Sequence, residues 1–179
     1  MEKIHSLTGM IDLIGHKTSK EDISERIFYA EEILRDIFES FSISEIRTPA
    51  LESSSLFKRS VGDSSDIVNK ELYSFLDKNE KSITLRPEGT ASVIRSVIEK
   101  KLDNDTHKLW YLGPMWRYER PQKGRYRQFN QAGVEILGYP EGLAELEIVS
   151  LICSINRALG IEDSVLKINH LGNNETKQN

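Results

Sequence analysis

Apolar residues recur at steps of three and four positions along residues 19–41. The repeating set is Ile23, Ile27, Ala30, Leu34, Ile37 and Phe41. Ser19 offers a capping oxygen at the start, and Glu21 and Asp22 place acidic charge in the first turn, where a helix dipole favours it. The pattern predicts an amphipathic helix whose apolar stripe meets a sheet or a partner subunit.

Several shorter segments have the pattern of strands. Residues 43–51 are expected to be extended, since Pro49 disfavours a helical conformation at Thr48. Residues 72–76 and 82–86 predict one hairpin, and residues 108–116 and 128–137 predict a longer one. Residues 165–169 predict a last strand.

Three further helices are expected between these strands. Residues 53–61 form a short one, followed by a polar loop over 63–70. Thr90 can cap a second helix that runs to residue 101, and a third covers 141–159, ended by Gly160 with an apolar contact from Ile161. Because the helices interleave with hairpins, the chain is expected to be one α+β domain, with a mostly antiparallel sheet flanked by helices.

The composition is that of an ordinary globular protein with one core. The chain has 179 residues, 29% of them charged, and a net charge of -4. It shows no signal-peptide pattern and no apolar run long enough to cross a bilayer. Cys153 is the only cysteine, which excludes an intrachain disulfide. Its apolar neighbours predict a buried structural thiol, and a reducing cytoplasm fits this usage. None of the histidines has the spacing of metal ligands, so no protein-bound metal is expected.

The segment 111–138 (YLGPMWRYERPQKGRYRQFNQAGVEILG) concentrates positive charge on this acidic chain. Its loop carries Arg117, Arg120, Lys123, Arg125 and Arg127. Such local charge indicates a site for a compact polyanion, such as a nucleoside triphosphate. On the second strand Gln131, Gly133 and Glu135 share one face, and the glycine leaves room for a ligand to approach. A solvated face of an ordinary hairpin has the same pattern, so periodicity alone leaves both interpretations open.

The residues themselves resemble a known family. The run WRYERPQKGRYRQFNQAGVEILG is similar to motif 2 of class II aminoacyl-tRNA synthetases, in the form typical of histidyl-tRNA synthetases. The run TLRPEGTA at 84–91 resembles the amino-acid-binding loop of that family. The helix of 19–41 with its Pro-containing strand resembles motif 1, which builds the family's dimer interface. Ser42 and Ile43 stand where the family usually has glycine and an aromatic residue.

The resemblance implies a cytoplasmic histidine–tRNA ligase that works as a homodimer. It would activate histidine with ATP and transfer the histidyl group to the 3′ end of tRNA(His). For ATP, it implies that Arg117 contacts the α-phosphate as the catalytic residue and that Glu119 holds the adenosine. Arg125 would reach the distal phosphates, and Phe129 would stack on adenine. Mg²⁺ would arrive with ATP, held by phosphate oxygens.

For histidine, the resemblance implies that Glu88, Thr90 and Gln131 surround the amino group and that Glu135 reads the imidazole ring. A buried carboxylate that accepts an imidazole N–H rejects side chains lacking that donor. A strand carboxylate paired with a nearby arginine is the alternative for Glu135.

The family's third motif, its histidine-specific segment and its anticodon-binding domain have no counterpart in these 179 residues. We therefore expect residues 1–179 to be the N-terminal part of a class II catalytic core, inactive by itself. Two alternatives stay open. One is a non-catalytic regulator or sensor of histidine metabolism, and the other is a dimerising scaffold that uses the first helix.

Overall fold

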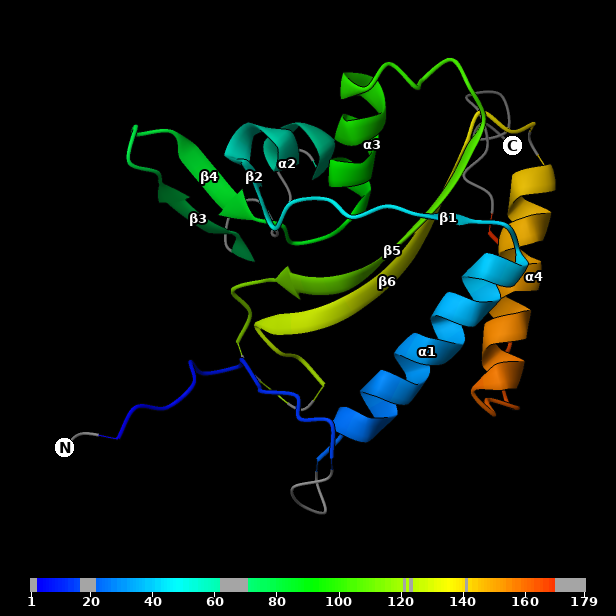
Figure 1. The fold of residues 1–179 in the computed structure, drawn as a ribbon, viewed down its shortest axis with the longest axis horizontal. Helices are drawn as coiled ribbons and strands as arrows, with labels where there is room; N and C mark the ends of the chain where they lie inside the picture. Colours follow the sequence, from blue (N-terminus) through cyan, green and yellow to red (C-terminus); the bar gives the residue numbers. More distant parts are fainter. Residues whose placement is uncertain are drawn as a thin grey trace, which may run out of the picture.

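The computed structural model describes residues 3–16, 22–61, 71–120, 122, 124–140 and 142–169 (Figure 1). Along the chain these form α1 (Ser24–Ser40), β1 (Ser44–Glu45), β2 (Leu51–Ser53), α2 (Ser54–Val61), β3 (Tyr73–Leu76), β4 (Ser82–Leu85), α3 (Thr90–Glu99), β5 (His107–Trp116), β6 (Gln128–Leu137) and α4 (Leu143–Ala158). The strands form two sheets, in the orders β1-β5-β6 and β2-β4-β3. Among the described strands only the β1–β5 pair is parallel, so the predicted α+β fold with mostly antiparallel pairing is confirmed.

The long hairpin of β5 and β6 is the centre of the molecule. Helices α1 and α4 cover one of its faces (Figure 1), where Phe38 packs on Trp110 with their ring centroids 5.1 Å apart. Helix α3 covers the other face, where Val93 and Val97 pack on Tyr111 and Met115. Successive strand residues point to opposite faces, so neighbours such as Trp110 and Tyr111 serve different cores. The stripe of α1 therefore meets the sheet, as its periodicity predicts.

Hydroxyl groups join the smaller sheet to the start of α2. The Ser54 hydroxyl lies 2.7 Å from those of Ser82 and Thr84, and Ser74 lies 2.7 Å from Thr84. Thr84 is fully buried, so these hydrogen bonds satisfy polar groups that would otherwise be costly inside the protein.

Three of the expected segments differ from the prediction or lie partly or wholly outside the described residues. Helix α1 begins at Ser24, whose backbone N–H donates to the Asp22 carboxylate at 2.9 Å, and Ser19 lies outside the described residues. The expected loop over 63–70 also lies outside them. The strand predicted over 165–169 is wrong. Val165 and Ile168 are 79% and 82% exposed, and no described strand pairs with this segment.

Helix α4 confirms one prediction and overturns another. Gly160 ends it with a φ of +70°, and the Ile161 N–H donates to Asn156 at 2.8 Å, which is the predicted glycine C-cap. The prediction that Cys153 is buried is wrong, because its side chain is exposed. Residues two apart on a helix point in very different directions, so Leu151 is buried while Cys153 is not. None of the described helices is long and apolar enough to span a membrane.

Candidate functional site

The face of the hairpin beneath α3 carries three of the predicted ligand-binding residues, Phe129, Gln131 and Glu135. Its strand register places Gly113 opposite Gln131 and Tyr111 opposite Gly133. Glu135 lies farther along the same face, and Phe129 lies at its other end. The predicted positions on β6 are therefore arranged along one face in the order of the sequence.

The turn between β4 and α3 reaches this face through Thr90. The Glu88 carboxylate accepts the backbone N–H groups of Thr90 at 2.6 Å and Ala91 at 2.9 Å. The prediction that Thr90 caps the helix is therefore wrong, because the preceding glutamate satisfies the free N–H groups. The Thr90 hydroxyl instead donates to Glu135 Oε1 at 2.7 Å, across 45 residues of sequence. The negative charge of Glu88 lies at the N-terminus of α3, where the helix dipole also stabilises it.

Arg117 is held from the same turn. Its Nε donates to the Pro87 carbonyl oxygen at 2.9 Å, and its guanidinium carbon lies 5.0 Å from the centroid of the Phe129 ring. Its terminal nitrogens donate to no other group in the part of the chain that the structure describes. These nitrogens can grip two oxygens of a phosphate, which suits a planar, permanently charged group. Phe129, expected to stack on adenine, here stacks on Arg117.

Two buried oxygen atoms of predicted ligand-binding residues lack hydrogen-bond partners. Within the described ranges, Glu119 Oε2 and Gln131 Oε1 are buried and unsatisfied. The nearest cation to the former is Arg125 Nη1 at 3.6 Å, beyond hydrogen-bonding distance, and the Arg125 side chain is mostly exposed. Buried polar atoms are rarely left without a partner, so both oxygens fit acceptors for a donor that a ligand brings.

The sequence did not identify Tyr111 as a site residue, yet this residue organises the site. A Cβ atom added at Gly89 or at Gly133 would lie 2.2 Å from atoms of the Tyr111 ring. The expectation that Gly133 leaves room for a ligand is therefore wrong, because this ring fills the space. The Tyr111 side chain also influences Glu135, because it lies beside both this carboxylate and Thr90. The sequence did contain a signal for this residue. Tyr111 alternates onto the same face as Arg117, and glycines lie among the predicted histidine contacts, with Gly89 between Glu88 and Thr90 and Gly133 between Gln131 and Glu135.

Burial dominates the electrostatics of this cluster. Desolvation raises the pKa of Glu135, and the negative charge of Glu88 adds to the increase, while hydrogen bonds from Thr90 and Tyr111 oppose it. Burial likewise raises the pKa of Tyr111. In the described part of the chain no arginine pairs with Glu135, so its partners are hydroxyl groups rather than the arginine considered from sequence. Hydroxyl donors leave acceptor capacity on the carboxylate for a further N–H.

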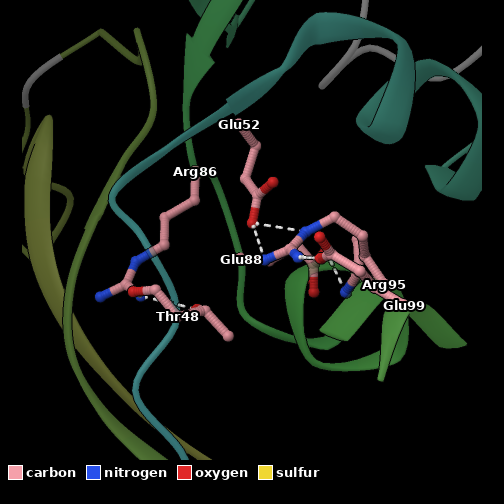
Figure 2. A network of polar contacts seen from close by, with 7 residues as sticks. Thr48, Glu52, Arg86, Glu88, Arg95 and Glu99 are labelled. Carbon is pink, nitrogen blue, oxygen red and sulfur yellow. Dashed lines mark hydrogen bonds and ion pairs between the residues drawn. The ribbon is translucent and has the colours of Figure 1, made fainter. Parts of the chain in front are cut away.

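Two arginines fasten the supporting elements (Figure 2). Arg95 on α3 donates to Glu52 Oε1 on β2 at 2.8 Å and 3.1 Å, and also pairs with Glu99. Arg86 donates to the Thr48 carbonyl and hydroxyl oxygens at 2.8 Å and 2.9 Å. Burial lowers the pKa of Arg86. These contacts fix α3 and the turn against the segments that precede them in sequence.

A groove of about 1040 Å³ lies between α2 and α3. Glu88 and Thr90 form one side of it, together with Arg95 and Ile98. Two of the predicted amino-group contacts, Glu88 and Thr90, thus line this groove, and Gln131 does not.

In sequence, the chain is similar to histidyl-tRNA synthetases. The family model described as histidyl-tRNA synthetase matches residues 17–174. The histidine–tRNA ligase of Synechococcus sp. strain WH7803 is 46% identical over 179 residues, covering 99% of this chain and 39% of that protein. The histidine–tRNA ligase of Pelobacter propionicus is 51% identical over 151 residues, covering 83% of this chain and 36% of that protein.

Solved structures agree in fold. The apo histidyl-tRNA synthetase of S. aureus superposes with a TM-score of 0.71 at 37% identity, over 89% of this chain and 36% of that one. A Bacillus halodurans protein described as an ATP phosphoribosyltransferase regulatory subunit/histidyl-tRNA synthetase also gives a TM-score of 0.71. At 23% identity, over 91% of this chain and 40% of that one, it supports the fold alone. The chain thus spans about two fifths of the proteins that it matches.

Proposed function

The chain belongs to the histidyl-tRNA synthetase family, and from this premise we propose that it carries the ATP- and histidine-binding face of a histidine–tRNA ligase. In the proposed reaction a carboxylate oxygen of histidine attacks the α-phosphorus of ATP. The bond to the bridging oxygen breaks, and histidyl-adenylate and pyrophosphate form. A hydroxyl of the 3′-terminal adenosine of tRNA(His) then takes the histidyl group and releases AMP.

One observation carries this proposal: a single turn holds both halves of the site. Pro87 fixes the guanidinium that would bind the α-phosphate, and Thr90 fixes the carboxylate that would read the imidazole. Arg117 directly follows β5 and Glu135 lies on β6, so this turn contacts residues from both arms of the hairpin. Adenylate formation needs the two substrates in line more than it needs covalent catalysis, and a shared anchor supports such positioning.

On the nucleotide side, Arg117 would neutralise charge that develops on the α-phosphate. Glu119 Oε2 would accept a hydrogen bond from the adenosine, which would satisfy its buried oxygen. The exposed side chain of Arg125 would reach the distal phosphates. Phe129 would present its ring to adenine, with Arg117 placed along that ring.

On the amino-acid side, Glu88, Thr90 and Gln131 would surround the ammonium group. The Thr90 hydroxyl donates to Glu135 and keeps lone pairs for an ammonium N–H. Gln131 Oε1 is the second acceptor without a partner. Glu135 would accept an imidazole N–H, and a substrate lacking that donor would leave a buried carboxylate unsatisfied.

Mg²⁺ would enter with ATP and be held mainly by phosphate oxygens. Across the described residues no three His, Cys, Asp or Glu side chains converge as ligands. Arg117 and Arg125, beside the proposed phosphates, would neutralise phosphate charge together with Mg²⁺.

We also propose that the protein acts as a homodimer and meets tRNA(His). An apolar cavity of about 280 Å³ lies between the N-terminal segment, α1 and the hairpin, lined by Ile11, Leu13, Ile27 and Leu34 among others. Such a surface beside the motif 1-like helix supports a second copy as its neighbour. Sedimentation analysis of the purified chain tests the proposed homodimer, and a monomer at all concentrations would contradict the homodimer.

Binding experiments test the proposed site, because the chain spans only part of the length of its relatives. We expect ATP and histidine each to bind, and Arg117→Ala to weaken ATP at least tenfold while histidine affinity stays within twofold. Arg26→Ala, which removes an exposed arginine on α1, is the matched control and should change neither. Binding of histidine without ATP would favour a regulator, and binding of neither would favour a scaffold.

Catalysis by the chain alone is a separate question. We propose that these 179 residues bind both substrates but give little histidine-dependent ATP–pyrophosphate exchange. Robust exchange that disappears in Arg117→Ala would contradict that proposal while supporting the site.

A further inference from the structure

The N-terminal arm, residues 3–16, runs past the loop end of the long hairpin, where β5 is connected to β6, on its way to α1 (Figure 1). There the Gly9 carbonyl oxygen accepts two backbone N–H groups, from Arg127 at 2.7 Å and from Gln128 at 3.1 Å. Gln128 is the first residue of β6. The arm is therefore hydrogen-bonded to the position where the basic loop ends and β6 begins.

Arg127 passes this constraint to the rest of the loop. Its carbonyl oxygen accepts the N–H of Arg117 at 2.9 Å, and its Nε donates to the carbonyl oxygen of Glu119 at 3.2 Å. Its guanidinium carbon lies 4.2 Å from the centroid of the Tyr118 ring. One residue held by Gly9 thus fixes the backbone of two proposed ATP contacts.

The conformation in which residue 9 accepts these two hydrogen bonds favours glycine. Gly9 has a φ of +80°, a conformation that other residues rarely adopt. A Cβ atom there would lie 3.0–3.2 Å from Cγ, N and Cβ of Arg127, so it would meet both backbone and side chain. The far end of the arm is anchored separately, because the Ile14 N–H donates to the Ser24 hydroxyl at 3.2 Å.

We propose that the arm, through the Gly9 carbonyl, is a positioning element for the nucleotide loop, so that ATP affinity depends on it and histidine affinity does not. The proposal rests on the ATP-binding role given above to Arg117, Glu119 and Arg125. A loop released from the arm would have to be ordered when ATP binds, and that ordering would subtract from affinity. Of the proposed histidine contacts, Glu88 and Thr90 lie in the turn at 86–90, and Thr90 donates to Glu135. Among the described residues no hydrogen bond joins these three to the arm.

The experiment compares Gly9→Ala with Gly15→Ala in the 179-residue chain. Gly15 lies in the same arm, but a Cβ there would meet nothing within 4 Å, which makes it a matched control. Amide hydrogen exchange by NMR reports on Arg127 and Gln128, and calorimetry reports the affinities for ATP and histidine. A deletion of residues 1–10 removes the carbonyl without introducing a clash, in case Gly9→Ala does not fold.

We expect the amides of Arg127 and Gln128 to be protected in the unaltered chain and in Gly15→Ala. In Gly9→Ala or in the deletion they should exchange at least tenfold faster, and ATP should bind roughly tenfold more weakly, with histidine within twofold. Exchange of both amides at the rate of an unstructured peptide in the unaltered chain would overturn the proposal. Equal loss of ATP and histidine affinity would also overturn it, since that indicates general destabilisation. If the unaltered chain bound no ATP, the proposed function would fail, while the exchange data would still decide whether the arm holds the loop.

Discussion

Gly133→Ala tests the packing at the centre of the site. The new Cβ would lie 2.2 Å from Cζ and Oη of Tyr111, whereas ordinary contacts lie at 3.4–4 Å. The ring must therefore move by more than an ångström. Tyr111 is only 5% exposed and packs against Met115 and Val93, so it has little room to do so.

The expected cost follows from the overpacking. Overpacking a well-filled core costs about 1–3 kcal/mol. This range corresponds to a fall in Tm of roughly 2–12 °C for a chain of this length. Urea unfolding monitored by circular dichroism measures the free energy, and thermal unfolding measures Tm.

Two further variants make this prediction specific. Gly15→Ala introduces the same methyl group where nothing lies within 4 Å, and it should change stability by no more than about 0.5 kcal/mol. In a Tyr111→Ala background, the added cost of Gly133→Ala should disappear, because the clashing ring is gone. A Gly133→Ala chain that unfolds within about 0.5 kcal/mol of the unaltered one would refute the reasoning.

Three other outcomes follow from the same contacts. Because burial raises the pKa of Glu135, the folded state holds its proton to higher pH than the unfolded state does, so this group's contribution to stability falls as pH rises through the window between the two pKa values. Glu135→Gln should therefore flatten that decline and raise stability at neutral pH while weakening histidine binding; unfolding curves at several pH values check this, and an unchanged pH profile would contradict it. Arg95→Met leaves the buried Glu52 carboxylate without its ion-pair partner and should cost about 3 kcal/mol in urea unfolding, whereas a loss below about 1 kcal/mol would mean that the pair does not hold α3 to β2. Cys153 should react with a thiol reagent in the native chain at close to the rate of a free cysteine, and protection that is lost only on unfolding would show that the thiol is covered.

Sequence periodicity was sufficient for elements that depend on local order. The 3.6-residue repeat in α1, the alternation in β5 and β6 and the glycine that ends α4 are all local patterns, and the structure confirms them. The motif-like runs also indicated which residues to examine at the site. The chain folds so that Arg117 and Glu135 are both anchored to the turn at 86–90.

The features that the sequence did not reveal all require knowledge of what lies nearby in space. In the sequence, Gly133 suggests free space on the strand face, but in the structure the Tyr111 ring from the neighbouring strand fills that space. Residues 165–169 have the alternation of a strand, but a strand exists only where another pairs with it. Cys153 sits among apolar letters, yet the direction of its side chain depends on how α4 rotates against the sheet.

The sequence by itself therefore determined most of the elements and the chemistry available to this protein, because both depend on residue types and their spacing. The tertiary structure alone decided which groups meet. The Thr90 hydroxyl donates to Glu135 across 45 positions, and the Gly9 carbonyl accepts from a loop more than a hundred positions away. Contacts of this kind join residues distant in sequence, and only packing and hydrogen bonding in the folded chain bring them within reach.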